Sequence, residues 1–282
     1  MNNLIWEPEI FAIGGTEFYE SELEAWITAN DMNTTSMLTY GATPLANLWH
    51  EVAEDDALER MIEFGGRHCY RAWQSGRDRD SYIKNIIEME HGSVLEHSSI
   101  NWAVQGVSRS FSLELARHRV GIALSQESQR FVDASKIKFV VPPMVSYLAG
   151  GGKNKSSVPE EFLAHCQHAV DNYVAMQEML LHGMRTHSDQ RTKSLTLLKK
   201  RANEAARAHL PNACETRFLW STNMRLLRHF LWLRGGSGAD LEIRRFAVKL
   251  LNIASSKAPS VFHDMTISSN DGAFGVPVIV AK

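Results

Sequence analysis

Arginine, histidine and serine side chains gather in one short stretch near the middle of the sequence. The run Arg117-His118-Arg119 is followed, after a small apolar insert, by Ser128 and Arg130, and no lysine interrupts it. Arginine presents a planar fork of N–H donors that matches an oxyanion, which the point charge of lysine does not. Adjacent cationic groups also repel one another unless an anion lies between them. The stretch therefore predicts an anion-binding site rather than an exposed helix end with scattered charges.

A second arginine-rich window, again without lysine, extends from residue 201 to residue 248. Arg207, Arg225 and Arg234 stand near the expected ends of secondary-structure elements, where ligands are usually bound. We expect the fold to bring both windows to one anionic ligand or to two. A nucleotide would supply one phosphate, and a dinucleotide cofactor would supply a second.

The second window contains both candidate ligand residues and candidate surface residues. Asn223, Arg225 and His229 surround the expected start of a helix, where free N–H groups and the helix dipole favour phosphate. Arg244 and Arg245 lie instead on an amphipathic helix, beside an acidic residue. For these two, we favour a solvated helix face over a functional role.

Neither the cysteines nor the remaining histidines form a strong catalytic or metal motif. Cys69, Cys166 and Cys214 are far apart, and there is no GxSxG, P-loop or GxGxxG sequence, so covalent catalysis has little support. His91 and His97 do not have the spacing that places two metal ligands on one helical face. We interpret them as hydrogen-bonded residues of a helix–strand connection or as ligand contacts. An enzyme of this kind would take its chemistry from a cofactor.

The composition narrows the class of protein. The chain has 282 residues, of which 44% are hydrophobic and 22% charged, as in an ordinary globular protein with a core. A net charge of −2 argues against broad binding to nucleic acid or to anionic membranes. No signal peptide, membrane-spanning run or CxxC pair is recognisable. We therefore expect a cytoplasmic protein with no nucleic-acid and no membrane partner.

Hydrophobic spacing and turn signals predict the elements that would position these residues. Helices are expected over residues 44–69, 77–90, 107–117, 157–180, 195–209, 223–233 and 241–257. Strands or extended segments are expected over residues 98–104, 138–143 and 218–221 and after residue 268, with short strands and turns over residues 1–40 and loops at 33–36 and 148–157. The 148–157 loop is interpreted as a surface loop within one domain, because the motifs on its two sides need each other.

At these residues the chain resembles the flavin-dependent thymidylate synthases. The signature of that family is Arg-His-Arg, seven residues, then Ser, with Arg shortly after. Here eight residues separate Arg119 from Ser128. Further family patterns are matched by residues 67–70 (Arg-x-Cys-Tyr), 91–97 (His-x-Ser, then Glu-His), 206–211 and 223–234. Jointly the matches are specific, and they run from about residue 65 to residue 250.

The resemblance implies an α+β fold with a central, mainly antiparallel sheet flanked by long helices. It implies one domain over residues 1–282, with a helical segment at about 157–209, and a homotetramer whose sites draw residues from several subunits. The implied reaction is reductive methylation of dUMP to dTMP. Methylenetetrahydrofolate would give the one-carbon unit to C5 of uracil, and FAD reduced by NADPH would supply the hydride.

The resemblance also implies a role for each matched residue, with no metal ligand among them. FAD would be contacted by His91, Ser93, Arg117, His118, Arg119, Gln126, Asn223, Arg225 and His229. The nucleotide dUMP would be contacted by Glu114, Arg117, Gln126, Glu127, Ser128, Arg130, Arg207 and Arg234. Within this set, Ser128, Arg130 and Arg207 would hold the phosphate. Arg234 would be the catalytic cation, which stabilises negative charge on uracil as N3 ionises.

Three departures from the family pattern bear on the substrate. The longer spacer predicts a bulge in the loop that carries Gln126 and Glu127, and it leaves open which of the two contacts the ligands. Glu114 stands where the family often has Gln, and a carboxylate near phosphate is unfavourable, so we expect it to turn away or to meet another group. The long helical region 157–200 either is structural or covers the folate.

Two alternatives stay open from the sequence. The spacer and Glu114 allow a variant enzyme with the same fold and flavin, namely a pyrimidine nucleotide hydroxymethylase or methylase that acts on dUMP or dCMP. A non-enzymatic nucleotide- or nucleic-acid-binding protein is the other alternative, and the slight acidity of the chain disfavours it.

Overall fold

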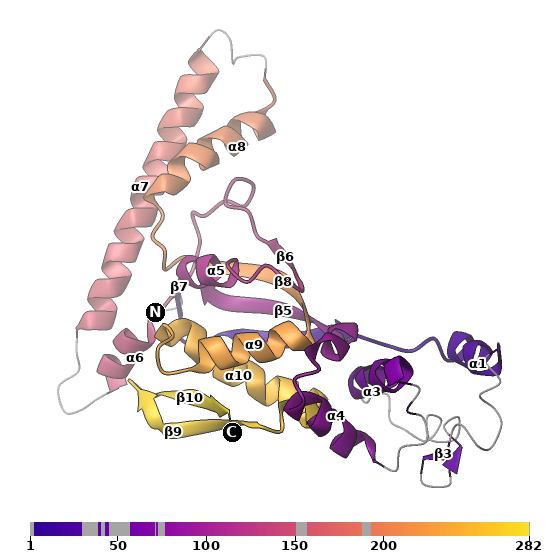
Figure 1. Ribbon diagram of the computed structural model, residues 1–282. Helices are drawn as coiled ribbons and strands as arrows, with labels where there is room; N and C mark the ends of the chain where they lie inside the picture. Colours follow the sequence, from indigo (N-terminus) through magenta and orange to yellow (C-terminus); the bar gives the residue numbers. More distant parts are fainter. Residues whose placement is uncertain are drawn as a thin grey trace.

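A four-stranded antiparallel sheet lies at the centre of the protein (Figure 1). The computed structural model describes residues 3–29, 39–40, 43–44, 57–70, 72, 77–150, 157–187 and 193–281. The strands, in spatial order, are β2 (Glu9–Gly15), β5 (Ser99–Ser108), β8 (Glu215–Asn223) and β6 (Ile122–Gln126). An antiparallel sheet combined with many helices confirms the expected α+β class. The loop expected at 33–36 lies outside the described residues.

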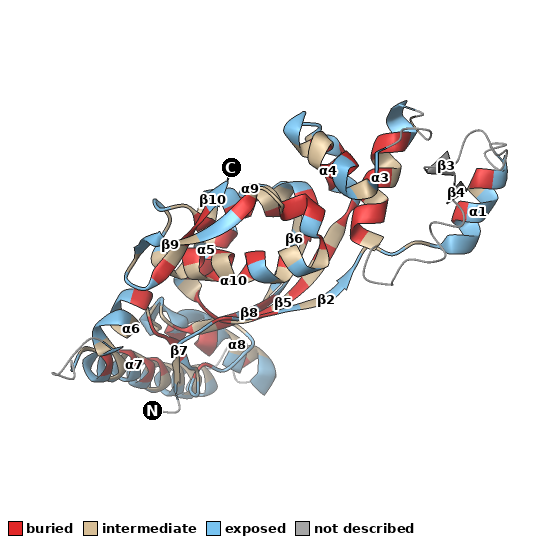
Figure 2. Ribbon diagram, turned by 90° about the horizontal axis from the view of Figure 1, so that it is seen from below, coloured by how far each residue is buried: buried red, intermediate tan, exposed pale blue. Residues whose placement is uncertain are grey.

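Helices cover one face of this sheet, and strand alternation determines which side chains they bury. Along β8, Phe218 and Trp220 are buried, whereas Leu219 between them is exposed on the opposite face. The buried face packs against α5 (Arg109–Leu115), α9 (Met224–Gly235) and α10 (Leu241–Lys257). Figure 2 shows buried positions along the sides of these elements that meet each other. Trp220 and Phe230 meet edge to face there, with ring centroids 5.2 Å apart.

The C-terminal segment differs from the sequence expectation. After η4 (Pro259–Phe262), strands β9 (Met265–Ala273) and β10 (Val276–Ala281) form an antiparallel hairpin that packs on α9 and α10. Ile279 lies so close to Gly235 that a Cβ on this glycine would come within 2.5 Å of it. The expectation of a turn with a short extended end was therefore wrong for β9, a nine-residue strand.

Two helices and a 3-10 helix lie beside the sheet, at the end where β5 begins. They are α3 (Ala57–Tyr70), α4 (Arg79–Glu88) and η2 (Gly92–His97), and the residues before α3 within the helix expected over 44–69 lie largely outside the described part. A buried ion pair joins Arg67 Nε to Glu63 Oε1 at 2.8 Å, and Arg79 reaches the other oxygen of the same carboxylate at 3.1 Å. Helix α1 (Glu20–Ala29) was not expected, because residues 1–40 suggested only strands and turns.

A long helical arm projects from the body (Figure 1). It consists of α7 (Val158–Thr186), α8 (Leu195–Ala206) and the short η3 (Arg207–His209), close to the expected helical segment. Helix α6 (Pro143–Gly150) occupies part of the segment expected as the loop 148–157, which was wrong for residues 148–150. Two-stranded pairs β1 (Leu4–Ile5) with β7 (Phe139–Val140), and β3 (Thr39–Tyr40) with β4 (Thr43–Pro44), complete the elements. Among the described residues, none of the helices has the length and apolarity needed to cross a membrane.

Candidate functional site

The Arg-His-Arg run lies in a turn between α5 and β6. The Ser108 hydroxyl caps α5 by accepting from the N–H of Phe111 at 3.1 Å. Gly121, with φ of +75°, leads the chain into β6 in a conformation that suits glycine. Arg117 and Arg119 are exposed on this turn, and within the described part of the chain their guanidinium groups have no hydrogen-bond or ion-pair partner. They are therefore available to an anion.

Arg234, near the C-terminal end of α9, joins the two arginine-rich windows. Its Nη1 donates to Glu114 Oε2 at 2.8 Å, and its Nε donates to His118 Nε2 at 3.0 Å. Glu114 thus meets another group, as expected from the sequence, and that group is the predicted catalytic cation. Nη2 of Arg234 has no partner among the described residues, so this nitrogen can still donate to a ligand.

The surroundings of Arg234 shift the pKa of both of its partners. Burial, reinforced by the charge of Arg234 and by His229, lowers the pKa of His118 to about 4. His118 is therefore neutral near pH 7, as its role as acceptor for Arg234 Nε requires. Burial raises the pKa of Glu114 above its ordinary value, with a further contribution from Asp240, while Arg234 and Arg117 oppose the rise. The trio is a partly buried network in which the arginine carries the positive charge.

The loop that follows Arg234 is fixed from α10. Arg244, only 4% exposed, donates through Nη2 to the carbonyls of Ser237 at 2.6 Å and Ala239 at 2.9 Å. Arg245 donates to the carbonyl of Trp6. The expectation of a solvated face for Arg244 and Arg245 was therefore wrong: both arginines tie α10 to neighbouring segments.

Residues 91–97 and the start of α9 form a second group of predicted ligand residues. Asn223 Oδ1 caps α9 by accepting from the N–H of Leu226 at 2.9 Å. Arg225, in the first turn, pairs with Glu96 and keeps 58% of its side chain exposed. A Cβ on Gly92 would lie 3.1 Å from Arg225 Nε, so η2 and α9 approach closely at this glycine. His91 and Ser93 are both exposed beside this junction.

His229 is exposed on α9, and its ring meets that of His118 edge to face, with centroids 6.3 Å apart. His91 stacks on Tyr70, with centroids 6.1 Å apart. His118 is therefore shared between the group around Arg234 and the group on α9. The two groups are connected through this histidine.

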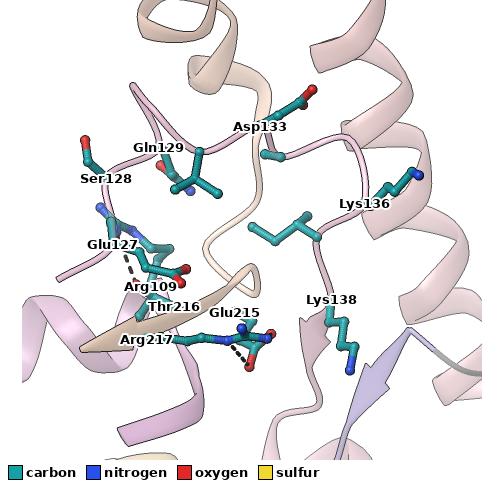
Figure 3. A pocket seen from close by; sticks show the side chains of 13 residues that line it. Arg109, Glu127, Ser128, Gln129, Asp133, Lys136, Lys138, Glu215, Thr216 and Arg217 are labelled. Atoms are coloured by element: carbon teal, nitrogen blue, oxygen red, sulfur yellow. Dashed lines mark hydrogen bonds and ion pairs between the residues drawn. The ribbon is translucent and has the colours of Figure 1, made fainter. Parts of the chain in front are cut away.

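A cavity of about 210 Å³ lies between the loop after β6 and strand β8, and one of the three predicted phosphate residues lines it (Figure 3). Ser128 lines this cavity, and Arg130 follows two residues later in a turn. Arg207 is exposed at the start of η3, and its charge reaches Arg109 on α5, which also lines the cavity.

Arg109 is a candidate that the sequence argument missed. Within the described residues its guanidinium makes long hydrogen bonds, of 3.4 Å to the carbonyl of Glu127 and 3.5 Å to the hydroxyl of Thr216. Burial and the neighbouring Arg207 lower its pKa below the ordinary value. The available signal was its place in the lysine-free segment around the Arg-His-Arg run.

Gln126 and Glu127 occupy different environments. Strand β6 pairs in regular register through Gln126, opposite Phe218, and the N–H of Glu127 still donates to Arg217 O at 2.9 Å. The expected bulge at this point was therefore wrong. The Gln126 amide donates to Thr216 Oγ1 at 2.9 Å, whereas Glu127 is exposed and lines the cavity.

All three cysteines are free thiols. Cys166 and Cys214 are buried, and burial raises their thiol pKa values to about 11 and about 12. Cys69 is exposed. The described residues contain no group of three or more His, Cys, Asp or Glu side chains that could hold a metal ion.

The fold and these side chains define an α+β protein in which arginine and histidine residues from distant parts of the sequence gather around α5, α9 and the loop after β6. The chain matches the family described as thymidylate synthase complementing protein over residues 52–260, and it belongs to this family. It is 38% identical over 218 residues to the flavin-dependent thymidylate synthase of Mycobacterium avium (strain 104), covering 76% of this chain and 82% of that protein. The same name is carried by a Mycolicibacterium gilvum (strain PYR-GCK) protein that is 38% identical over 226 residues, covering 78% and 84% of the two chains.

Proposed function

We propose that this protein is a flavin-dependent thymidylate synthase, which converts dUMP to dTMP with methylenetetrahydrofolate as one-carbon donor. FAD, reduced by NADPH, supplies the hydride. The observation that carries the proposal is the network around Arg234. It joins residues 116 and 120 positions apart in the sequence, so both arginine-rich windows meet at Arg234, the cation that we assign to the uracil ring.

The residues assigned to FAD suit an anionic dinucleotide. Arg117 and Arg119 are exposed cations without hydrogen-bond partners in the described chain, and Arg225 is largely exposed at the start of α9. The close approach of Gly92 to Arg225 supports a role for His91 and Ser93 in the same site. Asn223 contributes by capping α9, which keeps the positive end of the helix dipole at this junction. These residues would hold FAD together with His229. His118, whose ring meets that of His229 edge to face, would also contribute.

For the phosphate of dUMP, we propose Ser128, Arg130 and Arg207, with Arg109 added from the structure. The cavity beside Ser128 and the proximity of Arg109 to Arg207 support this set. Of the two residues left open by the sequence, Glu127 is the better candidate for ligand contact. Its carboxylate lines the cavity, whereas the Gln126 amide is already bonded to Thr216.

Arg234 would act as the cation that stabilises the uracil ring as negative charge develops. Glu114 and His118 each take one nitrogen of its guanidinium, which restricts the side chain and leaves Nη2 for the ring. Neutral His118 accepts a hydrogen bond without competing for the anion. Glu114 then acts on dUMP through Arg234, so its carboxylate gives no reason to favour a variant reaction.

We further propose the family fold as one domain over residues 1–282 and a cytoplasmic homotetramer with shared sites. The uncovered face of the sheet supports an interface, because Phe11, Ile13 and Leu219 remain 51%, 60% and 42% exposed there. These three residues line a shallow hollow of about 420 Å³. Three free thiols in the chain support a reducing compartment.

An absorbance spectrum of the purified protein tests the function most directly. We expect a visible flavin band that NADPH bleaches, measured with and without dUMP, and dTMP as the product in mass spectrometry after methylenetetrahydrofolate is added. A colourless protein that takes up no FAD would argue for a non-enzymatic binding protein. A hydroxymethylated product, or turnover of dCMP instead of dUMP, would establish the variant reaction.

A further inference from the structure

Helix α8 holds the loop that carries the proposed phosphate residues. Lys200 and Asn203 stand three residues apart on α8, and therefore on one face of it. The Lys200 ammonium lies 4.6 Å from the ring centroid of Phe131, and Asn203 Nδ2 donates to Arg130 O at 3.4 Å. The N–H of Ala134 lies 3.4 Å from the Tyr173 hydroxyl of α7. The arm thus fixes the main chain of the loop on both sides of Phe131.

Glu204, next on the same helical face, fixes the side chain of Arg130. Its Oε2 accepts from Arg130 Nε at 3.1 Å and from Nη2 at 2.9 Å. One edge of the guanidinium is therefore occupied, while Nη1 has no partner among the described residues. Glu204 also stands three residues before Arg207, so the carboxylate that pairs with one proposed phosphate ligand is close in sequence to another.

We propose that Glu204 is a positioning residue for the phosphate of dUMP, acting through Arg130. This inference rests on the proposed function, in which Arg130 contacts that phosphate. A free arginine side chain loses rotamer freedom when it binds an anion. Glu204 imposes that restriction before the nucleotide arrives and leaves the Nη1 donors for it.

Two effects of Glu204 oppose each other, and positioning is the larger. A carboxylate near a phosphate repels it, but Arg130 offsets most of this charge at a contact of 2.9 Å. Both side chains are also partly exposed, 39% for Arg130 and 46% for Glu204, so water and salt screen the remaining repulsion. The exposure makes the expected effect modest, because exposed ion pairs contribute little.

The test measures the Kd of dUMP on FAD-loaded protein for Glu204→Ala, Arg130→Ala and the double variant. We expect Glu204→Ala to raise the Kd about three- to fivefold, with KM for dUMP affected more than kcat. In the Arg130→Ala background the same change should have no further effect. Glu204→Gln, which still accepts from Arg130, should recover part of the loss. Glu178→Ala is the control, because it removes an exposed carboxylate of the adjacent helix α7.

Three outcomes would overturn the inference. Tighter dUMP binding by Glu204→Ala would make the carboxylate a competitor of the phosphate. An equal loss in the presence and absence of Arg130 would mean that Glu204 acts elsewhere on α8. An unchanged Kd in Arg130→Ala alone would remove the phosphate assignment itself, and that result is distinguishable because it appears without any change at Glu204.

Discussion

Two arginines of this protein, each paired with a glutamate, differ in burial and in how many of their donors are used within the described chain. Arg67 in α3 is 1% exposed, and each of its nitrogens has a partner: Glu63 at 2.8 Å and the carbonyls of Ala72 at 3.1 Å and Arg77 at 2.9 Å. Arg234 keeps 20% of its side chain exposed and has Nη2 left over among the described contacts. An arginine whose donors are all used within the chain holds the fold, whereas one with a spare donor can hold a ligand.

The largest expected effect is on the structural side of this comparison. Arg67→Ala should lower the free energy of unfolding by about 3–5 kcal/mol, because it removes the i,i+4 partner of the buried Glu63 carboxylate, which then keeps its longer contact with Arg79. Chemical denaturation measures this loss. Lys84→Ala, which removes an exposed ion pair from the neighbouring α4, is the control and should change stability by less than about 0.5 kcal/mol. Equal effects of the two changes would contradict the distinction.

The next effect is on the ligand side. Arg234→Ala should lower kcat about 10²- to 10³-fold, as expected when a positioned donor to a developing negative charge is lost. FAD content and the denaturation midpoint should stay close to those of the unaltered protein. Steady-state kinetics with dUMP checks the first expectation, and the flavin absorbance band checks the second. Arg234→Lys keeps the positive charge but loses the forked donors of the guanidinium. Its kcat should lie between that of Arg234→Ala and that of the unaltered protein. Normal turnover of Arg234→Ala would remove this residue from the catalytic role.

A smaller effect concerns the acceptor of Arg234. His118 has a pKa of about 4 in the folded protein, against 6.5 as its ordinary value. As the pH falls, His118 therefore takes up a proton in the unfolded chain before it does so in the folded protein. Its contribution to the free energy of unfolding is complete above about pH 6.5 and is lost between pH 6.5 and 4. The loss amounts to at most ~3 kcal/mol. Between pH 6.5 and 4, the denaturation midpoint should fall less steeply with pH in His118→Gln than in the unaltered protein. Parallel plots of midpoint against pH for the two proteins would contradict a neutral buried imidazole.

The hydrophobic pattern of the sequence predicted those elements in which apolar residues recur at one regular spacing, as in an amphipathic helix. The helix expected over 241–257 is α10, because its apolar residues recur at helical spacing. Strand β9 escaped prediction because its Ser, Asn, Asp and Gly residues favour turns, and pairing with β10 overrides that preference. Arg244 was misjudged for a related reason. The hairpin and the loop after α9 cover a face of α10 that looks solvated when the helix is considered alone.

For the site, the sequence predicted the kinds of residue but not their partners. The resemblance picked out Glu114, His118 and Arg234, yet their mutual contacts depend on how α5 and α9 cross the same sheet. Arg109 was missed because its role depends on Arg207, which lies almost a hundred positions away. Contacts of this range come from tertiary packing, which a local pattern does not encode.

Because β6 pairs in regular register, the face to which each of its side chains points depends on whether the number of residues after Arg-His-Arg is odd or even. Successive side chains of a strand point to opposite faces, so Gln126 and Glu127 are assigned to the helix side and to the cavity side by counting along the strand from its pairing with β8. One residue more or fewer, if taken up within the strand, would exchange those two side chains. Gly121 lies just before the first paired residue, in a turn that can absorb such a difference in length. The parity of the spacer, rather than its length alone, therefore decides whether an amide or a carboxylate faces the cavity that Ser128 lines.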